Sequence, residues 1–370
     1  HDHRRLRHAR ARQPDGPRLD GGWHRHHGRR RARPQRPDRG GRAACGVVER
    51  HRQLGRGHQQ QYGRRRERGG AGLGQSLRIN HSGTGPATLT FNAGALTGNI
   101  DKVLETGSNT TVVIAGGFDM PSGTAAARSV VLGGAGTTVF NGPISGSSAL
   151  VPSQKFGVVV GGSSTTTVGT TILNAANTYN GDTVVVSGTL RLGTSQALGS
   201  TAAGTIVTSS TLAAIPGGVL DLYGQSIQGE SLVLSGSSRG VALVNSRTGS
   251  SASWSGPVTA SGTATIGGAG PLTIAGTLTK IGSGTLTVAD GAVVTGSTSI
   301  QGGGVQLASA GGLAGSRVTP LAGGTLSLAS YLQASIGGLA PLAGGACVSG
   351  RAASGAWAQI AATHSSAASS

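Results

Sequence analysis

The chain has 370 residues, of which 67 are glycine, while aromatic residues make up 3% and charged residues 12%. So few aromatic side chains exclude an ordinary globular core built on Phe, Trp and Tyr, and the glycines lack the strict Gly-X-Y period of collagen. The net charge of +18 is concentrated in residues 1–70, which hold 21 of the 31 Lys and Arg and 6 of the 13 Asp and Glu, so that residues 71–370 are nearly neutral.

Residues 1–70 are rich in Arg, His and Gly and contain almost no Val or Ile. They cannot offset their ordering entropy by burial, so we expect them to be disordered. Three interpretations remain open: an arginine-rich arm for nucleic-acid phosphates, a weak metal site in the histidines at 24–27, or a stretch read in the wrong frame. The composition favours the third interpretation, a stretch read in the wrong frame. The segment gives little support to nucleic-acid binding, because it has no lysine and only Trp23 and Tyr62 as aromatics.

The composition changes near residue 70 and again near residue 340, and these changes define the expected organisation. Residues 71–164 are expected to be the irregular first part of a β-solenoid, and residues 165–340 the part of this β-solenoid that carries the repeats. Residues 341–370 show no alternation of apolar and polar residues, so we expect a frayed or non-native tail.

One pattern recurs in the regular part: Gly, any residue, aliphatic, polar, aliphatic. Aliphatic residues on both sides of a polar one indicate a strand with one buried and one wet face, and the glycine marks the turn before it. The six copies are 188–192, 218–222, 270–274, 284–288, 303–307 and 324–328.

The spacing of the last copies indicates the fold. The glycines Gly284, Gly303 and Gly324 recur at intervals of about 20 residues, which suits one turn of a solenoid in which stacked coils supply the core that no single coil can form. We therefore predict an all-β fold, a right-handed parallel β-helix (β-solenoid) lined by Val, Leu and Ile, preceded by a disordered Arg-rich segment.

Two segments resemble the autotransporter-associated β-strand repeat. Residues 171–193 contain Asn177-Thr178-Tyr179 and a Gly-Thr-Leu-Arg-Leu-Gly end, and residues 278–307 contain the opening lysine in the run Lys280-Ile-Gly-Ser-Gly-Thr-Leu286. The first segment lacks the opening lysine, and the second lacks the Asn-x-Tyr step.

The resemblance implies a passenger β-helix that is displayed on, or released from, a bacterial outer surface. It implies a structural and adhesive role, with a host surface, matrix or glycan as the partner. It also implies a translocator barrel in the full-length protein, which this sequence does not contain. We see no signal peptide and no run of 18 apolar residues that would indicate a transmembrane helix.

The residues give little support to an enzyme, and we expect no catalytic residue, metal or cofactor. Polysaccharide hydrolases need clustered carboxylates, whereas the seven acids after residue 70 are scattered and we expect them to be solvated. A Gly-x-Ser-x-Gly match at 236–240 has no helix after it, and the only later histidine is His364. The acids are Asp101, Glu105, Asp119, Asp182, Asp221, Glu230 and Asp290.

Tyr179 and Trp254 are the candidate ligand contacts, because an aromatic ring on an outer face could stack on a sugar. The sequence favours the alternative that each ring fills the interior or packs beneath a loop. A carbohydrate-active or carbohydrate-binding solenoid stays open as a second function. It would require two or more of the acids in the repeat region to lie within about 10 Å on one exposed face.

Overall fold

The computed structural model describes residues 76–92, 102–119, 128–146, 155–161, 168–209, 215–328, 334–341, 346–351 and 357–361. The chain divides into two units, residues 1–44 and 45–370, and all described residues belong to the second unit. All regular structure in these ranges is β-strand, and they contain no helix. The expectations for residues 1–70, including disorder, lie outside the described residues.

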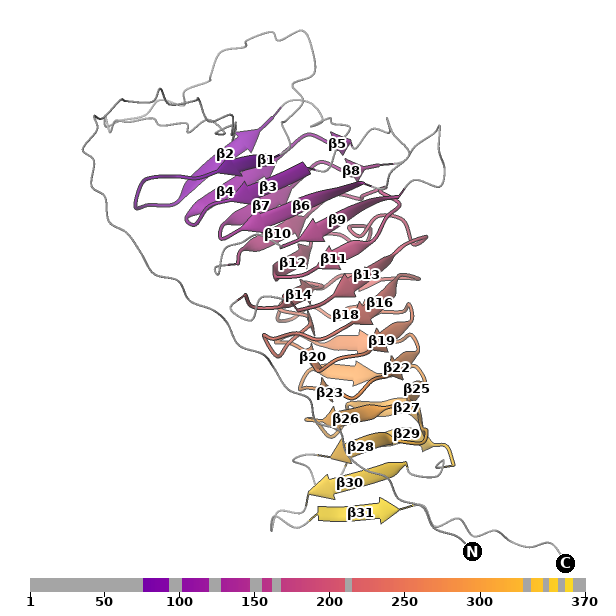
Figure 1. Cartoon of the computed structure of the whole chain (residues 1–370). Helices are drawn as coiled ribbons and strands as arrows, with labels where there is room; N and C mark the ends of the chain where they lie inside the picture. Colours follow the sequence, from indigo (N-terminus) through magenta and orange to yellow (C-terminus); the bar gives the residue numbers. More distant parts are fainter. Residues whose placement is uncertain are drawn as a thin grey trace, which may run out of the picture. The chain divides into compact units, whose positions relative to one another are not determined.

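The strands stack in parallel as a β-solenoid of about 10 turns, so the predicted fold class is confirmed (Figure 1). Along the chain each coil places one strand in a 12-stranded sheet and the next in a 13-stranded sheet. Some coils add a strand to a third sheet before the chain returns to the first. Strands that are adjacent in each sheet therefore belong to successive coils.

The 12-stranded sheet contains β1 (Ser76–Ile79), β3 (Lys102–Thr106), β6 (Arg128–Gly134), β9 (Phe156–Val160), β11 (Thr183–Val185), β13 (Gly204–Val207), β16 (Ser231–Leu234), β19 (Val258–Ala260), β22 (Leu278–Lys280), β25 (Thr298–Ile300), β27 (Leu313–Pro320) and β29 (Ile336–Leu339).

The 13-stranded sheet contains β2 (Ala87–Phe91), β4 (Thr110–Ile114), β7 (Thr137–Phe140), β10 (Thr170–Leu173), β12 (Gly188–Leu192), β14 (Gly218–Asp221), β17 (Leu243–Val244), β20 (Ala264–Gly267), β23 (Thr285–Val288), β26 (Gly303–Leu307), β28 (Gly324–Leu328), β30 (Cys347–Arg351) and β31 (Trp357–Ala361).

The third sheet contains β15 (Ser226–Ile227), β18 (Ala252–Trp254), β21 (Leu272–Ile274) and β24 (Ala292–Val294), and a two-stranded sheet contains β5 (Phe118–Asp119) and β8 (Ile144–Ser145). Between β18 and β27 the coils are most regular. Val258 pairs with Leu278, Leu278 with Thr298, and Thr298 with Val318, so that equivalent positions recur at a constant spacing.

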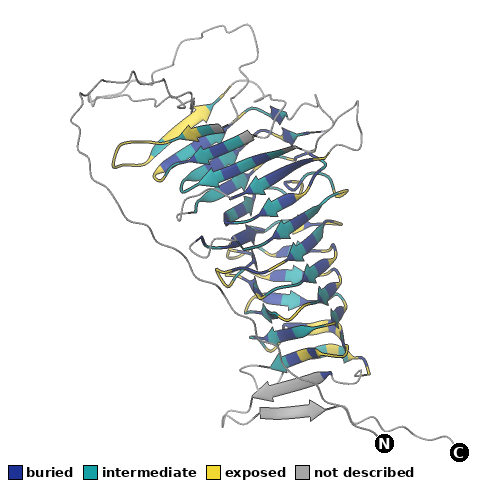
Figure 2. Cartoon of the chain, in the orientation of Figure 1, coloured by how far each residue is buried: buried dark blue, intermediate teal, exposed yellow. Residues whose placement is uncertain are grey.

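Side chains alternate between the interior and the outside along these strands (Figure 2). In β19, for example, Val258 and Ala260 are buried while Thr259 is half-buried. The interior is mostly Val, Leu, Ile and Ala from successive coils, which form one continuous apolar cluster. A half-buried strand surface favours such branched side chains. The paucity of aromatic residues is consistent with this narrow interior.

The six Gly-x-aliphatic-polar-aliphatic copies all form strands. Five of them, β12, β14, β23, β26 and β28, lie in the 13-stranded sheet, and Gly188 pairs with Gly218 as Gly303 does with Gly324. The sixth, β21, lies in the third sheet. Its glycine, Gly270, precedes Gly284 by less than the length of one coil, because β21 and β23 belong to different sheets.

The tail contains two described strands, β30 and β31. β30 pairs in parallel with β28, and β31 pairs with β30 as the one antiparallel partner among the described strands. The frayed or non-native tail expected for residues 341–370 stays a prediction, although 347–351 and 357–361 form strands. The last coil offers unpaired backbone groups, and these can bind an added strand whether or not its residues alternate.

Candidate functional site

The most developed polar site of the described chain lies outside the 13-stranded sheet, where β12 and β14 pair. Arg191 stands directly opposite Asp221, one coil apart, and both point away from the interior. The two form an ion pair, with 2.9 Å between Arg191 Nε and Asp221 Oδ2. We expected Asp221 to be solvated, and this expectation is wrong, because the residue is only 1% exposed.

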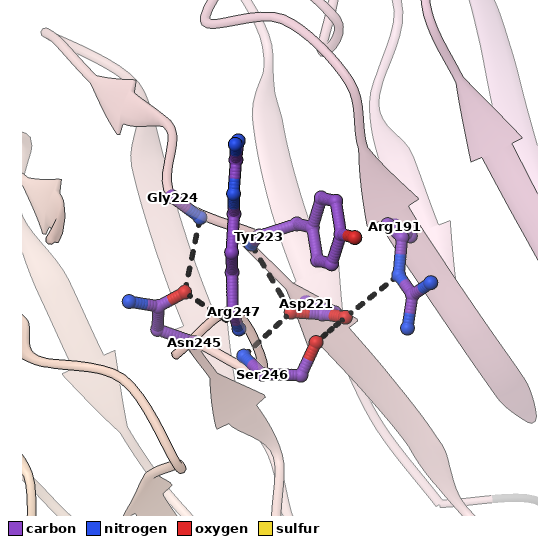
Figure 3. A network of polar contacts seen from close by, with 7 residues as sticks. All are labelled: Arg191, Asp221, Tyr223, Gly224, Asn245, Ser246 and Arg247. Atoms are coloured by element: carbon purple, nitrogen blue, oxygen red, sulfur yellow. Dashed lines mark hydrogen bonds and ion pairs between the residues drawn. The ribbon is translucent and has the colours of Figure 1, made fainter. Parts of the chain in front are cut away.

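Asp221 is buried because four donors surround its carboxylate (Figure 3). The backbone N–H groups of Tyr223 and Ser246 donate to Oδ1 over 3.1 Å each. Arg191 Nε and Ser246 Oγ, the latter at 2.6 Å, donate to Oδ2. Four donors account for the lone pairs of a carboxylate, so Asp221 is a fixed anchor for the chain around it.

The turn that covers Asp221 is held by Asn245, which is fully buried. Its Oδ1 accepts hydrogen bonds from the N–H groups of Gly224 (3.0 Å) and Arg247 (3.2 Å). Its Nδ2 donates to the carbonyls of Ser250 and Pro271, at 2.7 Å each. One amide thus ties three successive passes of the chain and fixes the backbone of Arg247.

Tyr223 lies between two arginines at the surface of this site (Figure 3). The guanidinium carbon of Arg191 is 4.5 Å from the centre of the Tyr223 ring, and that of Arg247 is 5.5 Å from it. Tyr223 has a φ of 48°, a left-handed conformation that is uncommon for a residue other than glycine. We refer to Arg191, Tyr223 and Arg247 as the arginine–tyrosine cluster.

The sequence reasoning missed this cluster, although it noted part of the signal. Arg191 and Asp221 occupy the same polar position in consecutive copies of the strand pattern, and opposite charges at matching positions of stacked coils are expected to meet. No pattern marks Tyr223 or Arg247, because they reach the cluster from turns and not from a strand.

A second group of polar residues lies inside the solenoid, on β11, on β13 and in the segments just before β11 and β16. Tyr179 Oη and Thr183 Oγ1 are 2.6 Å apart, and Thr183 pairs in register with Thr205. Thr205 Oγ1 donates to Glu230 Oε1 over 3.1 Å. Burial raises the pKa of the Tyr179 phenol well above its ordinary value, and the charge of Glu230 adds to this.

Glu230 is only 2% exposed, contrary to the expectation of a solvated acid. Burial raises the pKa of its carboxyl group from 4.5 to about 7, the Thr205 hydrogen bond opposes this rise, and the nearby charge of Asp182 adds to it. Asp182 itself is exposed and accepts a hydrogen bond from the N–H of Gly204. These two acids are electrostatic neighbours, yet they do not share an exposed face because Glu230 is buried.

Both candidate ligand contacts are fully buried. Tyr179 and Trp254 are each 0% exposed, and Trp254 Nε1 donates to the carbonyl of Glu230 over 2.9 Å. Neither ring is available to stack on a sugar in this structure, which agrees with the alternative that the rings fill the interior. Their polar tips are satisfied by Thr183 and by the Glu230 backbone.

Residues that carry the repeat resemblance hold coils together. Asn177 Oδ1 accepts from the N–H of Ile144 at 2.7 Å, and its Nδ2 donates to the carbonyl of Ala197, so that the side chain bridges two further passes of the chain. Lys280 is 0% exposed, and burial lowers the pKa of its amine. Its Nζ donates to the carbonyls of Ile281, Gly282 and Gly302.

The remaining candidates of the sequence have ordinary structural environments. Ser238, the central residue of the Gly-x-Ser-x-Gly match, lies in an exposed turn, where its Oγ accepts from the N–H of Gly217 at 2.7 Å. His364 lies outside the described residues.

A small cavity of about 10 Å³ beside Thr138 and Val160 has room for about one water molecule.

Within the described ranges, no group of three or more His, Cys, Asp and Glu could hold a metal ion. In the same ranges no helix has the length and apolar character needed to cross a membrane. Comparison with known proteins gave no matching family model, no matching curated protein and no matching solved structure.

Proposed function

We propose that the chain is a structural and adhesive passenger segment of an autotransporter-like surface or secreted protein. The support is the parallel β-solenoid together with the two segments that resemble the autotransporter-associated repeat. In this role the stacked coils form a support, and the turns and outer strand faces present binding surfaces to a host cell, a matrix or another bacterium.

The observation that carries the proposal is the position of the residues that resemble the repeat. Asn177 bonds to backbone groups in neighbouring passes, and Lys280 bonds to the carbonyl of Gly302 in the following coil. A repeat whose defining polar residues stabilise stacking is suited to building a long support. Adhesion would then depend on residues outside the repeat pattern, such as those in the turns.

The proposal is tested by displaying the full chain on a laboratory Gram-negative bacterium, between a secretion signal and a translocator barrel. Surface exposure is measured with an antibody, and adhesion with epithelial monolayers and matrix-coated plates. We expect displaying cells to adhere more than cells that carry the empty display system. Equal adhesion of the two, with the chain present at the surface, would contradict an adhesive role.

A further inference from the structure

We infer that the arginine–tyrosine cluster is a subsite for an anionic sugar of an acidic polysaccharide. This inference rests on the proposed adhesive function and names the class of ligand. Arg191, Tyr223 and Arg247 come from β12 and from two turns, and they meet on the outer face of the 13-stranded sheet (Figure 3). Tyr223 is half-buried and Arg247 is exposed, so the cluster is open to a ligand.

The cluster has an unbalanced positive charge. The charge of Arg191 is compensated by Asp221, whereas Arg247 makes no ion pair with any of the described residues. Among the described contacts, the guanidinium nitrogens of Arg247, the Nη atoms of Arg191 and the Tyr223 hydroxyl form no hydrogen bond with protein. Planar guanidinium groups with free N–H donors match the geometry of carboxylate and sulfate groups.

The cluster is also held in place before any ligand arrives. Asp221 fixes Arg191 through Nε, and Asn245 fixes the backbone of Arg247. The stem of Arg247 crosses Gly224, where an added Cβ would lie 3.2 Å from Arg247 Cδ. Side chains that are fixed in advance lose less entropy on binding, which favours recognition over chance contact.

The surroundings favour a polysaccharide over a nucleic acid. Both guanidinium groups lie against the Tyr223 ring, which leaves no ring face for the base stacking that single-stranded nucleic acids use. Residues 71–370 contain 10 Lys and Arg and 7 Asp and Glu, so they offer no broad basic surface for a phosphate backbone. A polysaccharide with separated sulfate or carboxylate groups needs only one such local site.

The test is arginine footprinting of the full chain, because a reading at individual arginines separates this site from the 21 Lys and Arg of residues 1–70. The chain is treated with phenylglyoxal alone or with a heparin octasaccharide, an oligogalacturonate, a neutral maltooligosaccharide or a single-stranded DNA. Modified peptides are measured by mass spectrometry. Arg239 and Arg317 are exposed and serve as internal controls on the same solenoid.

We expect an acidic oligosaccharide to slow modification of Arg247 about fivefold, as roughly 80% occupancy would, with little change at Arg239 and Arg317. Protection by the heparin octasaccharide alone assigns the site to sulfated sugars, and protection by both acidic sugars assigns it to anionic sugars generally. In the Arg247→Gln variant the acidic oligosaccharide should no longer protect Arg191 from modification. In the Arg239→Gln variant it should still protect Arg191.

The inference is overturned if Arg247 is not protected by either acidic sugar, if the neutral sugar or the DNA protects it equally, or if all three arginines are protected alike. Loss of this subsite would leave the adhesion assay as an independent test of the proposed function. Conversely, a chain without adhesion that still shows selective protection at Arg247 would retain the subsite and lose the adhesive role.

Discussion

Glu230 holds its carboxyl group inside the solenoid, where its pKa is raised from 4.5 to about 7. The folded chain therefore keeps this proton up to about pH 7, whereas the unfolded chain releases it near pH 4.5. Stability from this group is present below pH 4.5 and is lost as the pH rises through 7, by up to about 3 kcal/mol. The Glu230→Gln variant should lack this loss, because Gln carries no charge and still offers an oxygen to Thr205.

The measurement is the urea midpoint of the full chain at pH 4.5 and at pH 8. Relative to the parent, Glu230→Gln should gain stability at pH 8 and gain none at pH 4.5. Asp290→Asn is the matched control, because Asp290 is exposed and its removal should shift both midpoints alike. A Glu230→Gln difference that does not change with pH would refute the buried, protonated carboxyl group.

Asn245 can be tested by a change of almost no volume. In Asn245→Asp the two N–H groups of Gly224 and Arg247 keep an acceptor, but a carboxylate replaces the amide that donates to Ser250 and Pro271. We expect a loss of about 2–5 kcal/mol at pH 8, and a smaller loss at pH 4, where a protonated carboxyl can donate again.

The control for Asn245→Asp is Asn174→Asp. Asn174 is exposed, and among the described contacts its side-chain amide donates only to Asn141 Oδ1, at 2.8 Å. The Asn141 side chain can rotate so that its own amide N–H donates to the new carboxylate. Urea midpoints of both variants at the two pH values give the comparison. Equal losses at the two sites would show that the turn over Asp221 does not depend on the amide of Asn245.

For single residues, the sequence shows which positions are polar but does not show which of those polar side chains are buried. Asp221 and Glu230 look solvated because each stands alone in the sequence, yet both are buried by residues of neighbouring coils that are distant in the sequence. Those contacts follow from which residues of successive coils come into register, and insertions between strands change that register. For Tyr179 and Trp254 the sequence favours packing in the interior, and both side chains are buried. That expectation follows from the scarcity of large side chains in the chain.

Among the structural elements, the corner between the third sheet and the 12-stranded sheet depends on a glycine column, formed by Gly256, Gly276 and Gly296. A Cβ added at Gly276 would lie 1.9 Å from the Gly256 carbonyl oxygen, and one at Gly296 would lie 1.9 Å from that of Gly276. Backbone cannot yield as a flexible side chain can, so a methyl group here must separate two coils.

We therefore expect Gly276→Ala to lower the free energy of unfolding by about 2–4 kcal/mol. Gly311→Ala is the matched control, because a Cβ at Gly311 meets no atom within 4 Å. Urea unfolding followed by circular dichroism compares the two variants with the parent. A loss at Gly276 no larger than that at Gly311 would show that the corner can relax around the methyl group.

The strands themselves could be predicted from the sequence, because apolar alternation after a glycine is a local signal. Their assignment to sheets could not be predicted in this way. Thr170 pairs with Thr189 across one short coil, whereas Thr137 pairs with Thr170 across a much longer one. Turns of such different length hide the coil period in the sequence before residue 165, although the described strands β1 to β9 already stack in the solenoid sheets.

At the scale of the whole solenoid, each coil of the described unit contacts chiefly the coils before and after it, as the strand order of the two long sheets shows. The stability of such a stack is a sum of coil terms and nearest-neighbour terms. Among the described strands, β2 and β29 each have a strand neighbour on only one side, and Leu89 and Leu339 in these two strands are 42% and 46% exposed. Protection from hydrogen exchange should consequently be greatest in the middle coils.

A local defect should spread in steps through this stack, and the Gly276→Ala variant gives the test. Because Gly276 contacts the corners of the coils on both sides, peptides covering β18 and β24 should lose protection together with those covering β21 and β22. Strands β3 to β9 share no neighbour with the defect and should exchange at the parent rate. Hydrogen exchange of the full chain by mass spectrometry measures this. Uniform loss of protection from β3 to β28 would instead mean that the solenoid unfolds as one cooperative unit.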